Sequence, residues 1–523
     1  MTVPTPQSPS QHFPDLPQFS GFMKPCRLEG KVSNLEVYGE IPQDIDGTFY
    51  RVMPDPQLPP FVENDEWFNG DGNITAFRIL DGKVSFQQRY VRTEKFVRER
   101  AAERALIGKY RNKFTDAVRF KIRSTANTNV VYFNGNLLAL KEDSPPYALD
   151  PETLETYGLY TFNDQLPSMT FTAHPKFDPR TGEMICFGYE AKGDGTPDIC
   201  YYSVAPDGRF LQTVWLCAPV VAMIHDFAVT DNWVLFPIIP QVCDIERLKR
   251  GGDHWQWSPE TPFYIGVLPR RGAKPTDVKW YTYRNCFPGH TSNAYEDESG
   301  KIILDLGISN DNAFFWWPDA QGNAPEPSAI ATQLKRFTID PLSPSLDLSL
   351  GNPSVIQSDN CEFYRIDDRF ATQPYKHCFF DMMDVTLGTD FASISAQLGG
   401  GHPLYNAVGH LNIATGKTDV YFPGKTHMTG ETCAPQVSNQ HSLVRFPAAA
   451  NNGRTCHPAN AVLATGEGCR ATAKTLDEEG ALEFYYRVNV AYFILNDKRA
   501  FIGYRAFWGI DGVLFTLVTQ DKP

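Results

Sequence analysis

The sequence predicts an all-β fold in which short antiparallel sheets are arranged radially. The first observation is a recurring unit, a histidine that leads a β-hairpin, at His174, His225 and His290. In each unit a half-apolar run, a polar turn and a second apolar run follow the histidine. The turns hold residue types that bend the backbone easily, at 179–182, 231–232 and 298–300. The second observation is composition, since 39 glycines and 40 prolines fit many short strands joined by tight turns.

The three histidines are the first candidates for a functional site. They stand far apart in the chain, which suits successive sheets of a radial fold better than a short metal-binding loop. A single histidine in a strand is usually structural. Three histidines at equivalent positions of a recurring unit can bring three imidazoles to one axis, so the pattern predicts a metal site there.

The chain is expected to form one domain. Its 523 residues suit one large all-β domain or two or three smaller ones, and 42% hydrophobic residues support a real core. Residues 1–20 are polar and proline-rich and are expected to be disordered. No interior linker or low-complexity segment follows, which favours a single domain over residues 21–523.

Two local elements stand out within this pattern. Residues 96–108, rich in Ala, Leu, Arg and Glu, form the one clear helix candidate, with Gly108 as its stop. Residues 129–142 read as a hairpin with an Asn-Gly turn.

Charge and cysteine usage limit the partners and the compartment. The net charge of −13 and the lack of a basic stripe disfavour nucleic acid as a partner. Eleven cysteines, an odd number without close pairs, indicate free thiols in a reducing compartment. The N-terminus does not read as a signal peptide, and the apolar stretch 481–495 is interrupted by Arg487 and too short for a transmembrane segment. We therefore expect a soluble, cytoplasmic protein.

Several motifs together resemble the carotenoid cleavage oxygenase family, most closely its fungal branch that cleaves stilbenes such as resveratrol. The resemblance runs from about residue 20 to about residue 432, and its motifs lie at 39–57, 67–77, 172–184, 224–230, 289–297 and 361–367. It implies a seven-bladed β-propeller with a cap of helices and loops over the active site. It also implies non-haem Fe(II) held by four histidines near the propeller axis. The implied reaction splits a double bond with O2 into two carbonyl products.

The resemblance gives the histidines a role. His174, His225 and His290 match three of the iron ligands, and neutral imidazoles suit ferrous iron and leave room for O2. Family members orient these ligands through glutamates that accept from the other ring nitrogen. The matching positions, which would otherwise read as surface carboxylates, are Glu142, Glu362 and Glu431.

Three further residues match the substrate side of the family site. Thr128 matches a threonine beside the iron, although by itself it would be an ordinary strand residue. Tyr110 and Lys141 match a pair, specific to the stilbene-cleaving branch, that contacts the phenolic hydroxyl. A lysine near a phenol favours the phenolate by charge pairing. Without the resemblance, Lys141 would be a solvent-facing lysine at a strand end and Tyr110 an aromatic covering the core.

The C-terminal region, about residues 433–523, departs from the family. The fourth family ligand sits in a His-Gly segment close to the chain end, but no histidine follows His457 here. His441 and His457 both lie too near Glu431 to match. His410 leads a similar hairpin, yet its family counterpart is not a ligand. A frame-shifted or mis-spliced last exon would produce such a change.

Two other interpretations stay open at this stage. A zinc site from Cys456, His457 and Cys469 is conceivable but lacks a usual spacing. The chain as a whole is interpreted as a dioxygenase that cleaves the central C=C of hydroxystilbenes to two aldehydes. The alternatives are a carotenoid or apocarotenoid cleavage dioxygenase, or a catalytically impaired propeller that lacks the fourth ligand.

Overall fold

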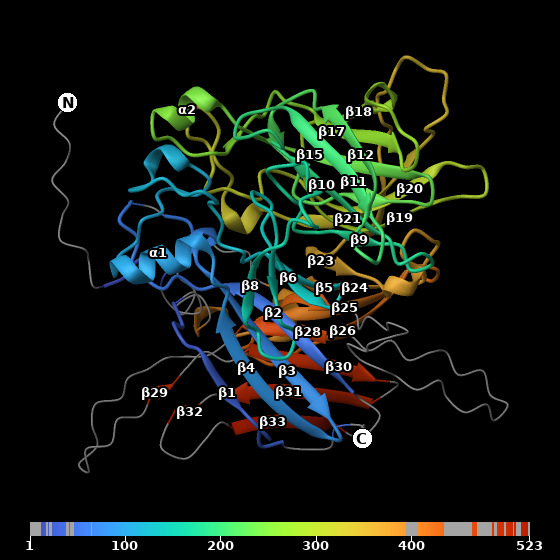
Figure 1. The fold of residues 1–523 in the computed structure, drawn as a ribbon. Coiled ribbons are helices and arrows are strands. Elements are labelled where there is room, and N and C mark those ends of the chain that lie inside the picture. Colours follow the sequence, from blue (N-terminus) through green and yellow to red (C-terminus); the bar gives the residue numbers. More distant parts are fainter. Residues whose placement is uncertain are drawn as a thin grey trace, which may run out of the picture.

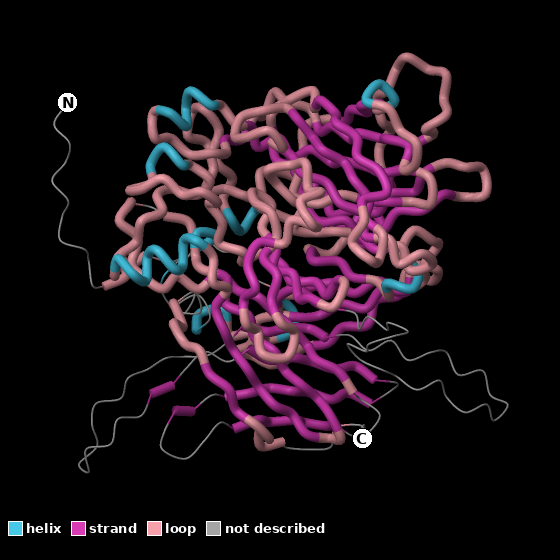
Figure 2. The backbone as a smooth tube through the Cα atoms, in the orientation of Figure 1, coloured by secondary structure: helices cyan, strands magenta, loops and turns pink. Residues whose placement is uncertain are grey.

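A computed structural model of the chain shows an all-β propeller (Figure 1), as the sequence predicts. The structure describes residues 65–393 and 405–430, together with 12–16, 19, 24–37, 41 and 46–63. From residue 431 onward it describes only the backbones of strands. Strands make up most of the regular structure, and helices are few and short (Figure 2). The predicted N-terminal segment, residues 1–20, lies largely outside the described residues.

Six antiparallel sheets follow one another along residues 30–421. The first two contain β1 (Gly30–Val32), β2 (Gly47–Pro54), β3 (Gly72–Leu80) and β4 (Lys83–Tyr90), then β5 (Asn129–Phe133), β6 (Asn136–Leu140), β7 (Tyr147–Leu149) and β8 (Thr156–Leu159). The third contains β9 (Lys176–Phe177), β10 (Met184–Tyr189), β11 (Asp198–Val204) and β12 (Phe210–Cys217). The fourth contains β13 (Ala222–Met223), β14 (Ala228–Val229), β15 (Trp233–Val242), β16 (Gln256–Trp257), β17 (Phe263–Pro269) and β18 (Lys279–Tyr283). The last two contain β19 (Phe287–Glu296), β20 (Ile302–Ser309), β21 (Thr332–Ile339) and β22 (Ser354–Gln357), then β23 (Cys361–Arg365), β24 (His377–Met382), β25 (Ala407–Asn412) and β26 (Lys417–Tyr421).

The blade count differs from the seven that the resemblance implied, because this part of the chain forms six. Beyond it, strand backbones pair in a five-stranded sheet and a separate two-stranded one. These strands are β27 (Gly430–Cys433), β28 (Leu463–Glu467), β30 (Asn489–Leu495), β31 (Lys498–Arg505) and β33 (Leu514–Gln520), with β29 (Phe484–Tyr485) and β32 (Phe507–Trp508) in the pair.

The expected cap of helices over the active site is not shown either. The described α-helices are α1 (Glu94–Ala102) and α2 (Ile245–Lys249), both on the left of the view in Figure 1. No helix in the described part of the chain has the length and apolarity needed to cross a membrane.

Helix α1 begins earlier and ends earlier than predicted. Thr93 caps its start by accepting from the backbone N–H of Phe96. It ends at Ala102 rather than Gly108, because Glu103 takes a left-handed conformation, with φ of 52°. Gly108 has another reason to be glycine, since a Cβ there would lie 2.3 Å from the Thr115 side chain.

The core lies between the sheets, as expected of stacked blades. A buried apolar cluster lies at each interface between consecutive sheets from β1–β4 to β23–β26. Strand β6 shows how the sequence does this: Leu137 and Ala139 pack toward the first sheet, and Leu138 and Leu140 toward the third. Successive side chains of a strand point to opposite faces, so an unbroken apolar run suits a blade covered on both sides.

Two sequence expectations can be followed in these sheets. Strands β5 and β6 form the predicted hairpin, and both turn residues, Asn134 and Gly135, have positive φ, as a tight Asn-Gly turn requires. The cysteines among the described residues, from Cys26 to Cys378, are all free.

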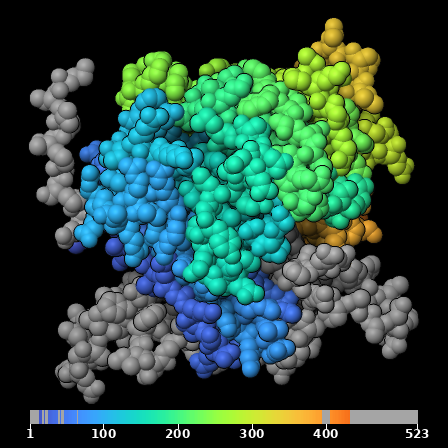
Figure 3. Space-filling view, in the orientation of Figure 1, coloured from blue at the N-terminus to red at the C-terminus, as the bar shows by residue number. Residues whose placement is uncertain are grey.

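The described surface in Figure 3 is continuous from the blue first sheet through the cyan second sheet to the green ones.

Candidate active site

The three predicted histidines lie together. His174 comes from the loop before β9, His225 from the segment between β13 and β14, and His290 from β19. The Nε2 atom of His225 is 3.1 Å from that of His174 and 3.1 Å from that of His290. Three segments far apart in the chain, each from a different sheet, therefore place three imidazoles at one point.

None of the three histidines belongs to a regular strand ladder, although each was expected to open the first strand of a hairpin. His174 and His225 lie just outside strands. His290 lies in β19 where the pairing with β20 shifts register, between Pro288 and Thr291. A local shift of this kind re-aims a side chain relative to the rest of its strand.

Two of the predicted glutamates fix the ring orientation. Glu142 Oε2 is 2.9 Å from His225 Nδ1, and Glu362 Oε2 is 2.8 Å from His290 Nδ1. Burial alone would raise the pKa of Glu142, but the neighbouring His225, Arg111 and Lys141 lower it to about 2. Both Nδ1 atoms therefore donate to carboxylates, which leaves the Nε2 lone pairs of these rings facing each other. Glu431 lies in β27, and its side chain is outside the described residues.

Gly289, which the sequence reasoning did not single out, makes room for Glu362. A Cβ on Gly289 would lie 1.9 Å from Glu362 Oε1. That same oxygen accepts the backbone N–H of His290 at 2.8 Å. Only glycine lets the carboxylate reach both the backbone and the ring of His290. In the sequence, the position of Gly289 directly before the candidate ligand His290 is the feature that could have indicated this role.

The donor set fits a divalent metal ion. Burial, followed by the neighbouring His225, lowers the pKa of His174 well below its usual range, so this imidazole is neutral. Neutral rings whose Nε2 lone pairs converge repel one another unless a cation lies between them. With metal–nitrogen bonds of roughly 2.1 Å, two ligands at a right angle are roughly 3 Å apart, which agrees with the 3.1 Å separations.

A second missed residue, Asp226, ties the three histidine segments together. Its Oδ2 accepts the backbone N–H and the hydroxyl of Thr291, at 2.8 and 2.7 Å. Its Oδ1 pairs with Lys176 Nζ at 2.7 Å. Thr291 and Asp226 each follow a histidine directly and Lys176 lies two residues after His174, so one buried carboxylate sets the spacing of all three segments.

The other candidate ligands do not join this group. His410 lies on β25 with its Nε2 2.9 Å from Nδ1 of His377, and its ring stacks on Phe379 at 4.5 Å. It is not among the residues that line the cavity described below. The alternatives near the C-terminus lie outside the described residues: His441, His457, Cys456 and Cys469.

One cavity of about 1020 Å³ contains the histidines and the predicted substrate-side residues. Its wall includes Thr128, Tyr110 and Lys141 as well as the three histidines. A volume of this size holds a molecule with two aromatic rings. The cavity therefore connects the candidate metal centre to the Tyr110–Lys141 pair.

Tyr110 and Lys141 meet in this wall. Lys141 Nζ is 3.4 Å from the Tyr110 hydroxyl and 4.6 Å from the centre of its ring. Both side chains are buried. Burial lowers the pKa of Lys141 and raises the pKa of Tyr110 well above its usual range. A buried ammonium beside a neutral hydroxyl can donate to an oxygen on a ligand and stabilise its negative charge.

An aromatic wall surrounds this polar pair. Tyr110 is stacked on Trp317, with ring centres 5.4 Å apart and planes 21° apart. Phe68 packs against both rings, at 5.6 and 6.1 Å. Flat walls of this kind favour planar aromatic ligands. This wall was not predicted from the sequence, where the aromatic run Phe314–Trp317 is its signal.

Comparison with known proteins agrees with this site. The family described as retinal pigment epithelial membrane protein matches residues 23–439. Resveratrol cleavage oxygenase 1 of Aspergillus fumigatus is 73% identical over 420 residues, which is 80% of this chain and 84% of that protein. Carotenoid cleavage oxygenase 1 of Neurospora crassa is 60% identical over 413 residues, 79% of this chain and 78% of that protein.

A solved structure extends the likeness to the whole fold. The crystal structure of lignostilbene dioxygenase from Pseudomonas brassicacearum has a TM-score of 0.81 and 37% identity, covering 98% of this chain and 100% of that one. Synechocystis apocarotenoid oxygenase, at 23% identity and a TM-score of 0.68, shares the fold. The family match and the high identity to these relatives show that the chain belongs to the carotenoid oxygenase family.

Proposed function

We propose that the protein is a non-haem Fe(II) dioxygenase that cleaves the central C=C of hydroxystilbenes, such as resveratrol or piceatannol. The alkene and one O2 give two aldehydes, so each carbon of the double bond gains one oxygen atom. The observation that carries this proposal is the single cavity that holds both the three histidines and the buried Tyr110–Lys141 pair. The names of the Aspergillus fumigatus and Pseudomonas brassicacearum relatives support it.

The metal-binding role falls to His174, His225 and His290. Glu142 and Glu362 hold two of these rings in the tautomer that presents Nε2 to the metal. When bound, ferrous iron supplies the redox chemistry that O2 requires. Thr128, on the same cavity wall, narrows the space beside the metal.

Tyr110 and Lys141 bind the substrate phenol. Lys141 stabilises the phenolate by charge pairing, and the Tyr110 hydroxyl donates to the same oxygen. The phenolate pushes electron density onto the central double bond, which makes oxidative cleavage easier. The aromatic wall around Trp317 holds the ring flat and excludes water.

The carotenoid alternative is favoured by the names of relatives such as carotenoid cleavage oxygenase 1 of Neurospora crassa. A polyene has no oxygen to offer the buried Lys141 amine. Filling the cavity with a polyene would leave the Lys141 ammonium with the Tyr110 hydroxyl as its only side-chain partner among the described residues and without a charge partner on the ligand. The Tyr110–Lys141 pair therefore supports a phenolic substrate.

Cleavage of matched substrates tests the proposal. The wild-type protein, loaded with iron, should cleave 4-hydroxystilbene about 10²–10⁴ times faster than 4-methoxystilbene, measured as aldehyde formed. Equal rates for the two compounds would overturn the phenol role and favour an unactivated alkene as substrate. Iron per chain, measured in the same preparation, tests the metal assignment separately.

The proposal also covers the domain organisation, the cap over the cavity and the cellular compartment. The six blades and the five-stranded sheet β27-β28-β30-β31-β33 would together make residues 21–523 one domain. Loops and short helices around the cavity would serve as its cap. The free cysteines support a cytoplasmic location.

A further inference from the structure

Two pairs of adjacent residues meet at the phenol end of the cavity. Tyr110 and Lys141 face each other across 3.4 Å. Their chain neighbours meet as well, since Arg111 Nη1 is 3.3 Å from Glu142 Oε1. One contact thus lies on the substrate side, and the other lies behind it, against the glutamate that orients His225.

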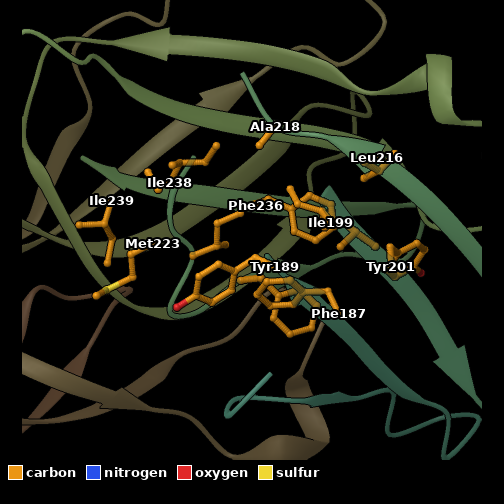
Figure 4. Packing of buried hydrophobic residues seen from close by; sticks show 14 of the residues in the cluster. Phe187, Tyr189, Ile199, Tyr201, Leu216, Ala218, Met223, Phe236, Ile238 and Ile239 are labelled. Carbon is orange, nitrogen blue, oxygen red and sulfur yellow. The ribbon is translucent and has the colours of Figure 1, made fainter. Parts of the chain in front are cut away.

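Arg111 is held rigidly. Its guanidinium lies beside the rings of Tyr189 and Trp255, at 5.0 and 4.9 Å from their centres. Its Nη1 donates to the Tyr189 hydroxyl and its Nη2 pairs with Glu190 Oε2 at 2.6 Å. Figure 4 shows Tyr189 near Phe187 in the apolar cluster. The backbone of Arg111 has a φ of 52°, a strained conformation that persists only where surrounding contacts enforce it.

The residues behind Arg111 lie as close together as metal ligands, but two of them make other contacts. Atoms of Glu190, Cys243 and His254 lie close enough together to hold an ion. However, His254 Nδ1 is 2.8 Å from the Arg111 carbonyl and His254 Nε2 is 2.9 Å from Glu190. Both ring nitrogens are therefore engaged, and the Arg111 cation already neutralises Glu190. The group acts as an anchor for Arg111.

Arg111 also occupies one of the carboxylates beside Lys141, that of Glu142. Glu142 gives one oxygen to His225 and the other to Arg111. Asp143 Oδ2 lies 4.0 Å from Arg111 Nε. Within the described residues the Lys141 side chain forms no salt bridge, and its one hydrogen bond is with Tyr110. A buried ammonium requires an anionic partner, and here that partner is left to come from the ligand.

We propose that Arg111 is a specificity-determining positioning residue: by holding Glu142, it keeps the Lys141 ammonium for the phenolic oxygen of the substrate. This inference rests on the proposed function. Without Arg111, Lys141 turns to the freed Glu142 carboxylate, and the phenol loses its charge partner. The preference for a hydroxyl over a methoxy substituent then falls, whereas a general loss of packing lowers cleavage of both substrates alike.

The test compares kcat/KM for 4-hydroxystilbene and 4-methoxystilbene. Because Arg111→Met alone would leave Glu190 uncompensated, the main variant is Arg111→Met with Glu190→Gln. Its hydroxyl-to-methoxy ratio should fall at least tenfold below that of the wild type. Glu190→Gln alone removes one anchor of Arg111 but keeps the Arg111–Glu142 contact, so it should lower the ratio clearly less than the double variant does; an equal fall in both variants would overturn the role of the Arg111–Glu142 contact. If the double variant does not fold, Arg111→Lys, which cannot reach both glutamates, should lower the ratio in the same direction.

A second readout does not depend on turnover. Under nitrogen, 4-hydroxystilbene bound to the wild-type protein should show phenolate absorption in a difference spectrum, and the Arg111 variants should show at least tenfold less. In a protein that already carries Lys141→Met, a further change at Arg111 should not alter the hydroxyl-to-methoxy ratio. Both changes act on the same interaction, between Lys141 and the phenolic oxygen. If the wild type has a high hydroxyl-to-methoxy ratio and the Arg111 variants retain it, the role of Arg111 is overturned but the proposed function is not. A wild-type ratio near one would overturn the proposed function and this inference with it.

Discussion

The metal end of the cavity takes its residues from three sheets, whereas the phenol end takes its two polar residues from a loop and one strand end. His174, His225 and His290 converge from segments far apart in the chain. Lys141 directly follows β6, and Tyr110 lies in the loop after α1. Each end is nevertheless fixed by buried carboxylates behind it, Glu362 at the metal end and Glu190 at the phenol end, with Glu142 shared between them. The difference indicates that metal binding depends on how the blades are arranged, whereas substrate choice depends on a few local contacts.

The largest expected effect comes from breaking the metal end. His225→Ala removes the imidazole whose Nε2 lies 3.1 Å from both others. Iron retention should weaken by more than the roughly 10–100-fold typical of losing an outer partner of a ligand, and cleavage of every stilbene should be lost. Iron per chain and aldehyde formation measure this.

His410→Ala is the matched control for that change. His410 also lies in a hairpin but contacts His377 instead of the cavity. Iron content and activity should stay at the wild-type level. Equal iron loss in both variants would show that the metal assignment is wrong.

The phenol end should respond differently. Lys141→Met keeps the apolar stem of the side chain but removes its charge. Iron binding should stay unchanged while the rate on 4-hydroxystilbene falls about 10²–10⁴-fold. Lys141→Met should lower the rate on 4-methoxystilbene only slightly. The methoxy group and the Lys141→Met change each remove the same interaction, between the lysine and the phenolic oxygen. If Lys141→Met also lowered iron binding, the metal end and the phenol end of the cavity would not act independently.

The sequence predicted the parts of this molecule that repeat or carry a strong motif. Histidine-led hairpins predicted the three converging imidazoles, and turn residues predicted the β fold. It did not predict Asp226, Gly289 or Arg111. Their roles depend on contacts between sheets, such as the 2.8 Å bond from the Thr291 N–H to Asp226, which no local pattern encodes. The end of α1 was misplaced for a similar reason. Glu99 accepts the backbone N–H groups of Leu106 and Ile107, at 2.7 and 2.8 Å, and so stabilises a chain reversal that helix propensity does not reveal.

The shared carboxylate should show an intermediate effect. Glu142→Gln keeps the shape of the side chain but weakens the hydrogen bond to His225 Nδ1 and the pairing with Arg111. Iron affinity, measured by competition with a chelator, should fall roughly 10–100-fold. The hydroxyl-to-methoxy ratio should change too, since Glu142 also borders Lys141. An unchanged iron affinity would count against its role behind His225.

The smallest expected effect comes from the backbone beside His290. Gly289→Ala places a Cβ where it would lie 1.9 Å from Glu362 Oε1, so the carboxylate must move away from the His290 backbone N–H and ring. Iron affinity should fall by about tenfold, at the lower limit of outer-partner losses, with the hydroxyl-to-methoxy ratio retained. Gly351→Ala is the matched control, because nothing lies within 4 Å of a Cβ there. If Gly289→Ala left iron affinity unchanged but altered the substrate ratio, Glu362 would belong to the substrate side, and the division between the two ends would need to be redrawn.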